Sequence, residues 1–404
     1  MKAALFLLVT LFAFSNVQSQ WIQLNSGTSY CLNSVYFIDA NIGYITGDNG
    51  TILKTSDGGT NWLLQSSGTT NILTSIYFVN ADTGYAVGYG DLNYSVILKT
   101  TNGGTNWTLS HSDSSSSGLY SVFFVNSNVG YVVGGSVILK TIDGGVNWIN
   151  QNPNVYYGVS SAYFVNEDTG YAVGAEATIL KTIDGGLNWI TLSSFSWGYY
   201  NSVFFINADT GYIVGYGNTG PHTGMPIIKK TIDGGINWTE QAIGINKWLY
   251  SVYFTDANTG YIVGGGGLIL KTTNGGTNWV QQTSETSVSL HSVYFTDSIT
   301  GYAVGDGGTI LKTINGGSVG INEGQNKNWE INIFPNPFEA KVKIEIPETK
   351  KCEAKVFDIF GKEVYSKAIN KTEELDLKFL TSGVYIVMVN LGNKGIFYKK
   401  IIKN

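Results

Sequence analysis

The residues of this sequence that could do chemistry recur at regular intervals. A turn of the form Thr-x-Asp/Asn-Gly-Gly returns along the first three quarters of the chain and places the same kind of side chain in one slot each time. The residues in that slot are Asp57, Asn102, Asp143, Asp184, Asp233, Asn274 and Asn315. Because four Asp and three Asn share the slot, it requires a hydrogen-bond acceptor and not a charge. We therefore expect these residues to cap tight turns, without a role in catalysis or metal binding.

The other reactive side chains form no recognisable catalytic or metal motif. The histidines His111, His222 and His291 lack the spacing of metal ligands. No G-x-S-x-G motif is set between a strand and a helix, and no phosphate-binding G-x-x-x-x-G-K-[ST] loop is present. We expect no metal, no cofactor and no catalytic residue, and of the histidines only His222, inside an insertion, is of interest. Cys31 and Cys352 are expected to be small buried residues that form no disulfide with each other.

These residues are embedded in a repeat of about 41 residues. The unit reads S-V-Y-F, G-Y-x-V-G, I-L-K-T and D/N-G-G-x-N-W, which is the pattern of four short strands separated by turns. It begins at Ser34, Ser75, Ser121, Ser161, Ser202, Ser251 and Ser292. Seven such units predict an all-β fold, a seven-bladed β-propeller over residues 20–318. The Trp residues should pack between blades, and the repeated lysines, such as Lys54, Lys99, Lys140 and Lys181, should be solvated or snorkelling at the blade edges.

The two ends of the repeat region complement each other. The seventh unit stops after Asn315-Gly316-Gly317 without its fourth strand, whereas Trp21 to Leu24 resemble a fourth strand that lacks the other three. The N-terminal strand is thus expected to complete the seventh blade, which would close the ring and remove the unpaired edges.

The remaining segments predict export. Residues 1–19, with Lys2 followed by the apolar run 3–14, have the order of a secretory signal peptide. No other stretch is apolar for long enough to span a bilayer. All 24 basic residues are Lys and the net charge is -5, which argues against nucleic-acid binding. After a linker at 319–328, residues 329–404 alternate apolar residues and Gly turns, as expected for a small β-sandwich.

The repeats over residues 21–317 resemble the seven-bladed propellers of the photosystem II assembly and stability factor family and other bacterial Asp-box or BNR-repeat proteins. Such propellers include both enzymes and binding scaffolds. Sialidases of this fold bind the substrate carboxylate with three arginines, and this chain has none, which excludes that activity. The resemblance likewise does not carry over the arginine-bearing surface of the photosystem family. Xyloglucanase-type glycosidases use two carboxylates that face a cleft, and the sequence nominates no such pair.

The C-terminal region resembles a sorting domain. Its landmarks are Ile333-Phe334-Pro335-Asn336-Pro337, the segment 356–364, Ser382-Gly383-Val384-Tyr385 and the closing run 399–403. They are similar, in the same order, to the C-terminal type A sorting domain of the type IX secretion system. The resemblance implies passage through the periplasm, recognition of residues 329–404 by the secretion machinery at the outer membrane, and release or attachment at the cell surface.

One face of the expected propeller varies between repeats. It carries insertions at 89–95 and 216–226 and a set of unusual side chains in the loops that enter blades 4 to 6. The residues that we nominate for ligand binding are Tyr156, Tyr157, Trp197, Tyr199, Tyr200, His222, Trp248 and Tyr250. Exposed aromatic residues of this kind suit stacking on sugars or anchoring a partner. The sequence thus predicts a secreted or cell-surface, monomeric binding propeller with a carbohydrate or protein ligand; the alternatives are a polysaccharide-degrading glycoside hydrolase and a purely structural matrix protein.

Overall fold

The structure, a computed structural model, is described here for part of the chain. The described residues are 20–90, 94–113, 118–151, 158–193, 198–217, 224–241, 243–317, 331–346, 352–358, 363–390 and 396–404. They form two compact units, one within Gln20–Ser318 and one within Val319–Asn404, and each unit is considered by itself.

The first unit contains seven four-stranded antiparallel sheets among its described residues. Counted from the centre outward, the first strands are β2 (Leu32–Phe37), β6 (Ile72–Phe78), β10 (Leu119–Phe124), β14 (Val159–Phe164), β18 (Tyr199–Phe205), β22 (Leu249–Phe254) and β26 (Leu290–Phe295). The second strands are β3 (Gly43–Gly47), β7 (Gly84–Tyr89), β11 (Gly130–Gly134), β15 (Gly170–Gly174), β19 (Gly211–Tyr216), β23 (Gly260–Gly264) and β27 (Gly301–Gly305).

The outer half of each sheet is built in the same way. The third strands are β4 (Ile52–Thr55), β8 (Ser95–Thr100), β12 (Val137–Thr141), β16 (Ile179–Thr182), β20 (Pro226–Thr231), β24 (Leu268–Thr272) and β28 (Thr309–Thr313). The fourth strands are β5 (Leu63–Gln65), β9 (Thr108–Asp113), β13 (Ile149–Asn150), β17 (Ile190–Ser193), β21 (Thr239–Glu240), β25 (Val280–Gln282) and β1 (Ile22–Leu24). Two 3-10 turns, η2 (Ala175–Ala177) and η4 (Asp306–Gly308), follow β15 and β27.

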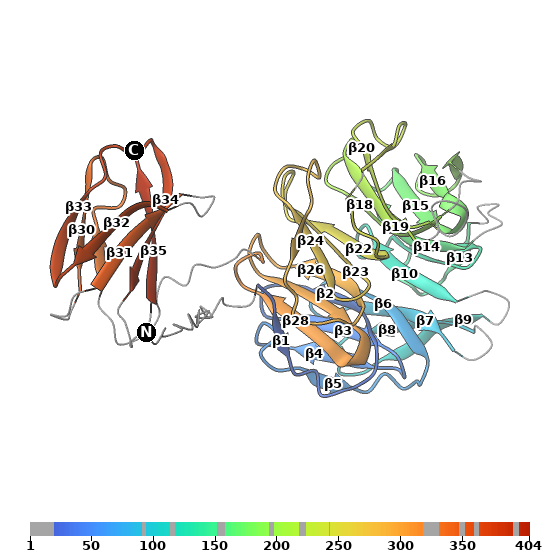
Figure 1. Cartoon of the computed structure of the whole chain (residues 1–404). Coiled ribbons are helices and arrows are strands. Elements are labelled where there is room, and N and C mark those ends of the chain that lie inside the picture. Colours follow the sequence, from blue (N-terminus) through green and yellow to red (C-terminus); the bar gives the residue numbers. More distant parts are fainter. Residues whose placement is uncertain are drawn as a thin grey trace, which may run out of the picture. The chain divides into compact units, whose positions relative to one another are not determined.

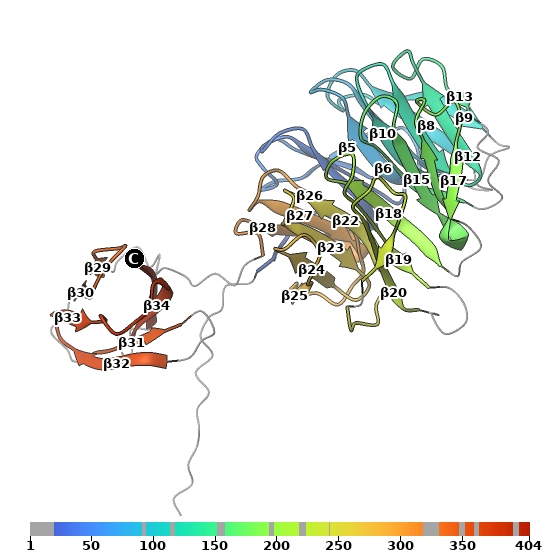
Figure 2. The ribbon, with the colours of Figure 1, turned by 90° about the horizontal axis from the view of Figure 1, so that it is seen from above.

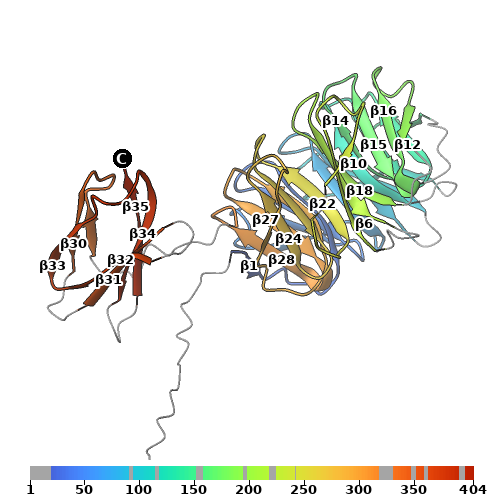
Figure 3. The ribbon, with the colours of Figure 1, turned by 45° about the horizontal axis from the view of Figure 1, so that its top comes forward.

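The sheets form a closed ring of blades. Each first strand contacts the first strand of the next sheet, and β26 returns to β2; Figure 3 shows several of these strands side by side. We number the blades 1 to 7 from β2–β5 to β26–β28 with β1. The seven sheets agree with the seven repeats in the sequence, and the all-β propeller is the expected fold class.

The G-Y-x-V-G motif forms the second strand of each blade, and its side chains are buried on both faces because blades cover it from both sides. In blade 1 the first glycine of the motif is required by packing. A Cβ atom on Gly43 would lie 2.5 Å from the Phe37 ring, so any larger residue would displace that ring. The Tyr of the motif reaches the next blade, where the Tyr44 ring stacks on Phe78 with centroids 3.9 Å apart.

Each blade also clasps the next through one carbonyl group. The Tyr44 hydroxyl donates to the Gly103 carbonyl oxygen at 2.8 Å, and Lys54 Nζ donates to the same oxygen at 2.6 Å. The Lys54 ammonium lies 5.5 Å from the centre of the Tyr44 ring. The same arrangement recurs in all seven blades. Of the two expected arrangements, solvated or snorkelling lysines, the structure corrects the first, because each ammonium group donates to a carbonyl of the neighbouring turn.

The expected closure of the ring is confirmed. Strand β1 pairs with β28, with Ile22 opposite Lys312 and Leu24 opposite Ile310, and Figure 1 shows the blue N-terminal strand beside the orange last one. Trp21 is fully buried, and its ring meets the Phe295 ring edge-on at 5.9 Å. Trp62 meets Phe37 in the same way and at the same distance in blade 1. The N-terminal residues thus supply the missing Trp and fourth strand of blade 7.

The second unit is a two-layered β-sandwich. One sheet has the order β29–β30–β33 and the other β32–β31–β34–β35, and Figure 2 shows the two layers. The strands are β29 (Asn332–Phe334), β30 (Lys341–Glu345), β31 (Cys352–Phe357), β32 (Glu363–Ile369), β33 (Thr372–Asp376), β34 (Gly383–Asn390) and β35 (Ile396–Lys403). One apolar core, with Val342, Val356 and Val387 fully buried, joins the layers. Within the described residues of both units, no helix has the length and apolarity needed to cross a membrane.

Candidate binding face

The channel through the propeller is narrowed by a closed ring of aromatic side chains. The residue before the last one of each first strand contributes one ring. These residues are Tyr36, Tyr77, Phe123, Tyr163, Phe204, Tyr253 and Tyr294. Neighbouring centroids lie between 4.9 and 5.6 Å apart, and Tyr294 returns to Tyr36 at 5.3 Å. Two residues earlier, the repeated Ser side chains accept backbone N–H groups of the next blade, as Ser34 does from Ile76 at 3.4 Å. These described channel positions carry hydroxyl and aromatic groups, and none carries a carboxylate.

A β-bulge shapes the entrance of the channel. In every blade the register of the first strand shifts between its first core residue and the repeated Ser, as between Leu32 and Ser34. Bulges re-aim a side chain and are frequent beside functional sites. The bulged residues are Asn33, Thr74, Tyr120, Ser160, Asn201, Tyr250 and His291. Five residue types occur at these seven positions although the rest of the repeat is nearly uniform.

Two further variable positions meet the bulge at this entrance. One position follows the last glycine of the G-Y-x-V-G motif, and the other precedes the first core residue of the first strand. The N–H of the former bonds to the carbonyl of the latter, as Asp48 does to Cys31 and Gly265 to Trp248, both at 2.9 Å. In blade 5 these two positions are Tyr216 and Tyr199, at the ends of β19 and β18. A Cβ atom on Gly47 would lie 2.2 Å from the Cys31 carbonyl oxygen, so the close approach requires glycine. We call the entrance lined by these three variable positions of each blade the channel mouth.

An aromatic row crosses blades 5 and 6 at the channel mouth. The ring of Tyr216 lies between Tyr199, with centroids 5.5 Å apart and planes inclined by 28°, and Trp248, with 4.5 Å and 16°. Trp248 is 46% and Tyr199 is 36% exposed. Burial raises the pKa of the Tyr216 hydroxyl, and Tyr199 adds to the effect. The three rings therefore stack on one another in a partly exposed row.

A polar chain continues the mouth across blades 6, 7 and 1. The Tyr250 ring lies 5.2 Å from the His291 ring, and His291 Nε2 lies 2.8 Å from Asp306 Oδ1. The same oxygen accepts a hydrogen bond from Cys31 Sγ at 3.2 Å. Beyond it, Asn33 Nδ2 donates to Asp48 Oδ1 at 3.0 Å. Tyr250, His291, Asp306 and Cys31 therefore form one connected group.

The electrostatics of this polar chain depend on Asp306. Burial disfavours its charged form, but hydrogen bonds from His291 and Cys31 outweigh burial and hold the pKa of the Asp306 carboxyl below its usual value. Burial, the hydrogen bond to Asp306 and the charges of Asp48 and Asp306 raise the pKa of the Cys31 thiol. The thiol is therefore protonated at neutral pH in this arrangement. The ligand atoms of Cys31, His291 and Asp306 all lie within 4.8 Å of one another and are thus close enough to share a metal ion.

The structure brings together only some of the residues nominated from the sequence. Tyr199 and Trp248 share the aromatic row, and Tyr250 is half-buried beside His291. Tyr200 is only 1% exposed, and its nomination was wrong because it occupies the core position that Leu32 holds in blade 1. The other four nominated residues lie outside the described part of the chain and are Tyr156, Tyr157, Trp197 and His222.

Other members of the mouth were missed. Tyr216 separates the two nominated rings, and Cys31, His291 and Asp306 come together although the spacing of the histidines gave no sign of a metal site. Cys31 is half-buried and hydrogen-bonded, which corrects the expectation of a buried apolar residue; Cys352 is buried in the sandwich core, and the two form no disulfide. The signal was present in the repeats, because these residues occupy the positions that vary while their neighbours recur.

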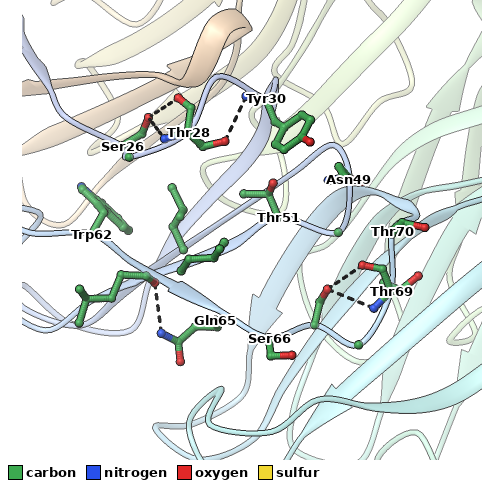
Figure 4. A pocket seen from close by; sticks show the side chains of 17 residues that line it. Ser26, Thr28, Tyr30, Asn49, Thr51, Trp62, Gln65, Ser66, Thr69 and Thr70 are labelled. Atoms are coloured by element: carbon green, nitrogen blue, oxygen red, sulfur yellow. Dashed lines mark hydrogen bonds between the residues drawn. The ribbon is translucent and has the colours of Figure 1, made fainter.

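A separate cleft lies outside the mouth, at blade 1 and the connections that precede and follow it. This cleft of about 960 Å³ is formed by the segment 26–30, the turn 49–51 and the segment 62–70, as shown in Figure 4. Its hydroxyl groups serve their own loops, since Ser26 donates to the Thr28 carbonyl at 3.0 Å and Ser67 to the Thr69 carbonyl at 3.2 Å. We therefore place the candidate site at the channel mouth, where exposed side chains from different blades converge.

Both units of the structure match known protein families. Residues 13–113, 109–194 and 230–320 match the family described as photosynthesis system II assembly factor YCF48. The chain belongs to this propeller family. Residues 332–404 match the secretion system C-terminal sorting domain. This match marks the chain as a type IX secretion cargo that is secreted or attached to the cell surface. No match was found among curated proteins.

Solved structures share the propeller fold. The structure described as YCF48 bound to D1 peptide is 19% identical, with a TM-score of 0.61, and the match covers 74% of this chain and 97% of that one. YCF48 from Cyanidioschyzon merolae is 20% identical over 72% and 98%, with a TM-score of 0.60. The GH74 enzyme of Niastella koreensis is 16% identical over 81% of this chain and 59% of that chain, with a TM-score of 0.58. At these identities the likeness concerns the fold alone.

Proposed function

We propose that the exported propeller is a non-catalytic binding protein that holds an extracellular carbohydrate or protein at the channel mouth. The observation that supports this function is the aromatic row of Tyr199, Tyr216 and Trp248. Aromatic side chains clustered at a concave surface supply much of the binding energy in protein interfaces. Trp248 and Tyr199 at the two ends of this stacked row are exposed, and rings of this kind pack against the apolar face of a sugar ring or a planar side chain of a partner.

The charges at the mouth narrow the class of ligand. The three variable positions carry two carboxylates across the seven blades, Asp48 and Asp306, and no lysine. An anionic ligand would therefore meet like charges at these positions, and the nearby Lys247 ammonium already donates to the Gly266 carbonyl at 2.8 Å. A neutral polysaccharide, or a protein segment that presents neutral or basic side chains, fits this surface better.

A glycoside hydrolase is the second candidate, and the same two carboxylates favour it. Hydrolysis of a glycosidic bond requires one carboxylic acid and one carboxylate. Asp48 and Asp306 both lie beside Cys31 at the mouth. However, the pKa of Asp306 is lowered, whereas a general acid needs a raised pKa to remain protonated at neutral pH. Binding without turnover is therefore the function that we favour.

The test uses the exported chain, residues 20–404, on a panel of neutral polysaccharides and glycoproteins. Retention and soluble products are measured in the same incubation. We expect saturable retention without product, and we expect the Trp248→Ala and Tyr216→Ala variants to lose it. Tyr30→Ala is the matched control, because Tyr30 is 47% exposed and lines the outer cleft instead of the mouth.

Two results would contradict this proposal. Release of product that stops on Asp306→Asn would show a hydrolase. Retention that survives both mouth substitutions but is lost in Tyr30→Ala would place the ligand in the outer cleft.

A further inference from the structure

Three metal-ligating side chains of different types meet where the ring closes. Cys31 precedes the first strand of blade 1, His291 is the bulged residue of β26, and Asp306 begins η4 after β27 in blade 7. They come from three segments and lie at least 15 residues apart in the sequence. Thiol, imidazole and carboxylate are the three side-chain groups that zinc prefers.

The separations suit a small tetrahedral ion. Zn–S bonds of about 2.3 Å and Zn–N or Zn–O bonds of about 2.0–2.2 Å place neighbouring ligand atoms roughly 3.3–3.6 Å apart. The structure has Cys31 Sγ at 3.2 Å and His291 Nε2 at 2.8 Å from Asp306 Oδ1. For an ion to bind, these two separations must each widen by less than about 1 Å, and all three ligand atoms already lie within 4.8 Å of one another. The side chains of His291 and Asp306 are 26% and 46% exposed, so an ion can reach them from solvent.

The arrangement does not fit a cysteine nucleophile. In a nucleophilic site the imidazole contacts the thiol and removes its proton. Here Asp306 Oδ1 lies between the two groups and bonds both of them. A carboxylate in that place holds the thiol in its protonated form. A cation bound between the three groups would satisfy the same Asp306 oxygen.

From this geometry we infer that Cys31, His291 and Asp306 bind one Zn²⁺ ion at the channel mouth. The ion joins blade 1 to blade 7, beside the joint where β1 completes the last sheet. Three protein ligands leave a fourth position for water or for a group of a bound ligand. The site thus reinforces ring closure and adds a cationic centre to a face whose fixed charges are negative.

Binding is accompanied by a defined exchange of protons. Zinc coordinates the thiolate form of cysteine and the unprotonated nitrogen of imidazole. His291 coordinates through Nε2 as the neutral tautomer that carries its proton on Nδ1, the Cys31 thiol proton passes to the buffer when the S–Zn bond forms, and no electron is transferred. Zinc affinity should accordingly rise with pH, and the heat of binding should change with the ionisation enthalpy of the buffer.

Zinc titration of the metal-stripped chain, residues 20–404, tests the site. Isothermal calorimetry with ZnCl₂ under reducing conditions should give one ion per chain, with proton release. Cys31→Ser, His291→Ala and Asp306→Asn should each weaken binding at least about tenfold, which is 1.4 kcal/mol. Saturating zinc should raise the melting temperature of the parent chain, and a chelator should reverse the shift. Cys352→Ala and His111→Ala are the matched controls and should bind zinc as the parent does.

A spectroscopic test on the parent chain does not require any variant of the three proposed ligands to fold. Co²⁺ in place of zinc should give the parent chain an intense thiolate-to-cobalt absorption that the Cys352→Ala protein keeps. Parent protein that binds neither ion, that shows no such band, or that binds zinc equally well after Cys31→Ser would overturn the proposal.

Discussion

Lys312 Nζ lies 2.6 Å from the Gly58 carbonyl oxygen although 254 residues separate the two in the chain. This contact is the seventh of a circle of identical contacts, and it links the last blade to the first. The Tyr302 hydroxyl donates to the same oxygen at 2.7 Å. A Gly carbonyl exposed by a tight turn thus becomes a specific blade-to-blade acceptor, and the ring is held by the same device at its closure as elsewhere.

Substitution of Lys312 tests this device. Lys312→Met keeps an unbranched stem against the Tyr302 ring but removes the donor, and the Gly58 carbonyl retains the Tyr302 hydroxyl. We expect the free energy of unfolding to fall by about 0.5–1.5 kcal/mol, the usual net contribution of one hydrogen bond. Lys140→Met, which breaks the bond to Gly185, is the matched control inside the ring. Denaturant unfolding of both variants measures the change in the free energy of unfolding. An unchanged midpoint for both would show that these hydrogen bonds between blades do not stabilise the ring.

Deletion of residues 20–26 tests the closure itself. The deletion removes β1 and the fully buried Trp21, which leaves β28 with an unpaired edge and opens the core beside Phe295. We expect the melting temperature of the propeller to fall sharply and the chain to associate through the open edge. Calorimetry and light scattering follow the two effects. A truncated chain that melts at the parent temperature would show that the N-terminal strand is dispensable.

The turn aspartates predict how the propeller responds to acid. Hydrogen bonds from the backbone and side chain of Asn61 lower the pKa of Asp57 to about 2, and those from Asn147 do the same for Asp143. Because the folded pKa lies below the ordinary 3.8, these caps contribute stability above about pH 4 that is lost as the pH falls towards 2. Melting temperatures measured between pH 7 and pH 2 should show this decline.

Asp57→Asn separates the charge from the hydrogen bond. Asn102 already fills this slot in blade 2 and accepts the N–H of Asn106 at 2.9 Å. The variant should melt near the parent temperature at pH 7 and lose less stability in acid, whereas Asp57→Ala should melt lower at both pH values. Equal acid sensitivity in parent and Asp57→Asn would show that this carboxylate does not contribute.

Tyr199 and Tyr200 should separate binding from stability. Tyr200 is buried in the core of blades 4 and 5, so Tyr200→Ala should cost about 3–5 kcal/mol of unfolding free energy, as large aromatic truncations do. Tyr199→Ala removes an exposed ring of the aromatic row and should weaken ligand retention with little change in stability. Thermal unfolding and ligand retention are measured on both variants. A Tyr199→Ala protein that loses stability but keeps retention, with a Tyr200→Ala protein of parental stability, would contradict this assignment.

Removal of residues 329–404 should block the last step of export. The sorting domain match covers 332–404, and Gln20–Ser318 form a compact unit of their own. We expect the shortened protein to fold and to accumulate in the periplasm. Fractionation of the producing bacterium measures its location, and normal appearance in the medium or on the cell surface would contradict the role of this domain.

The sequence carried enough information for the fold because the fold is repeated. Hydrophobic runs, Gly turns and the stray Trp21 each follow from local rules that seven copies reinforce. The Lys54 contact could not be predicted, because its acceptor belongs to the next repeat and its exposure depends on how blades pack. Tyr200 was misassigned because an aromatic residue in a Leu position looks like part of the neighbouring loop.

The candidate site could be predicted only in part, since it depends on residues that break the repeat. Trp248 and Tyr199 stand out in the sequence because they are aromatic residues where other repeats have none. Tyr216 completes the aromatic row from the end of another strand. Cys31 and His291 are 260 residues apart and meet only because the ring closes. Comparing the seven repeats position by position would have singled them out, whereas reading the spacing along the chain could not.

The most direct test of the binding account is the ratio of two dissociation constants. The ligand is one that the parent chain retains, and its Kd is measured by calorimetry. The Kd of Trp248→Ala should be at least about tenfold higher than that of the parent, a loss of 1.4 kcal/mol. The Kd of Tyr30→Ala should equal that of the parent. That result would place the ligand on the aromatic row at the channel mouth. Equal Kd values for Trp248→Ala and the parent, with weakening in Tyr30→Ala, would contradict the account.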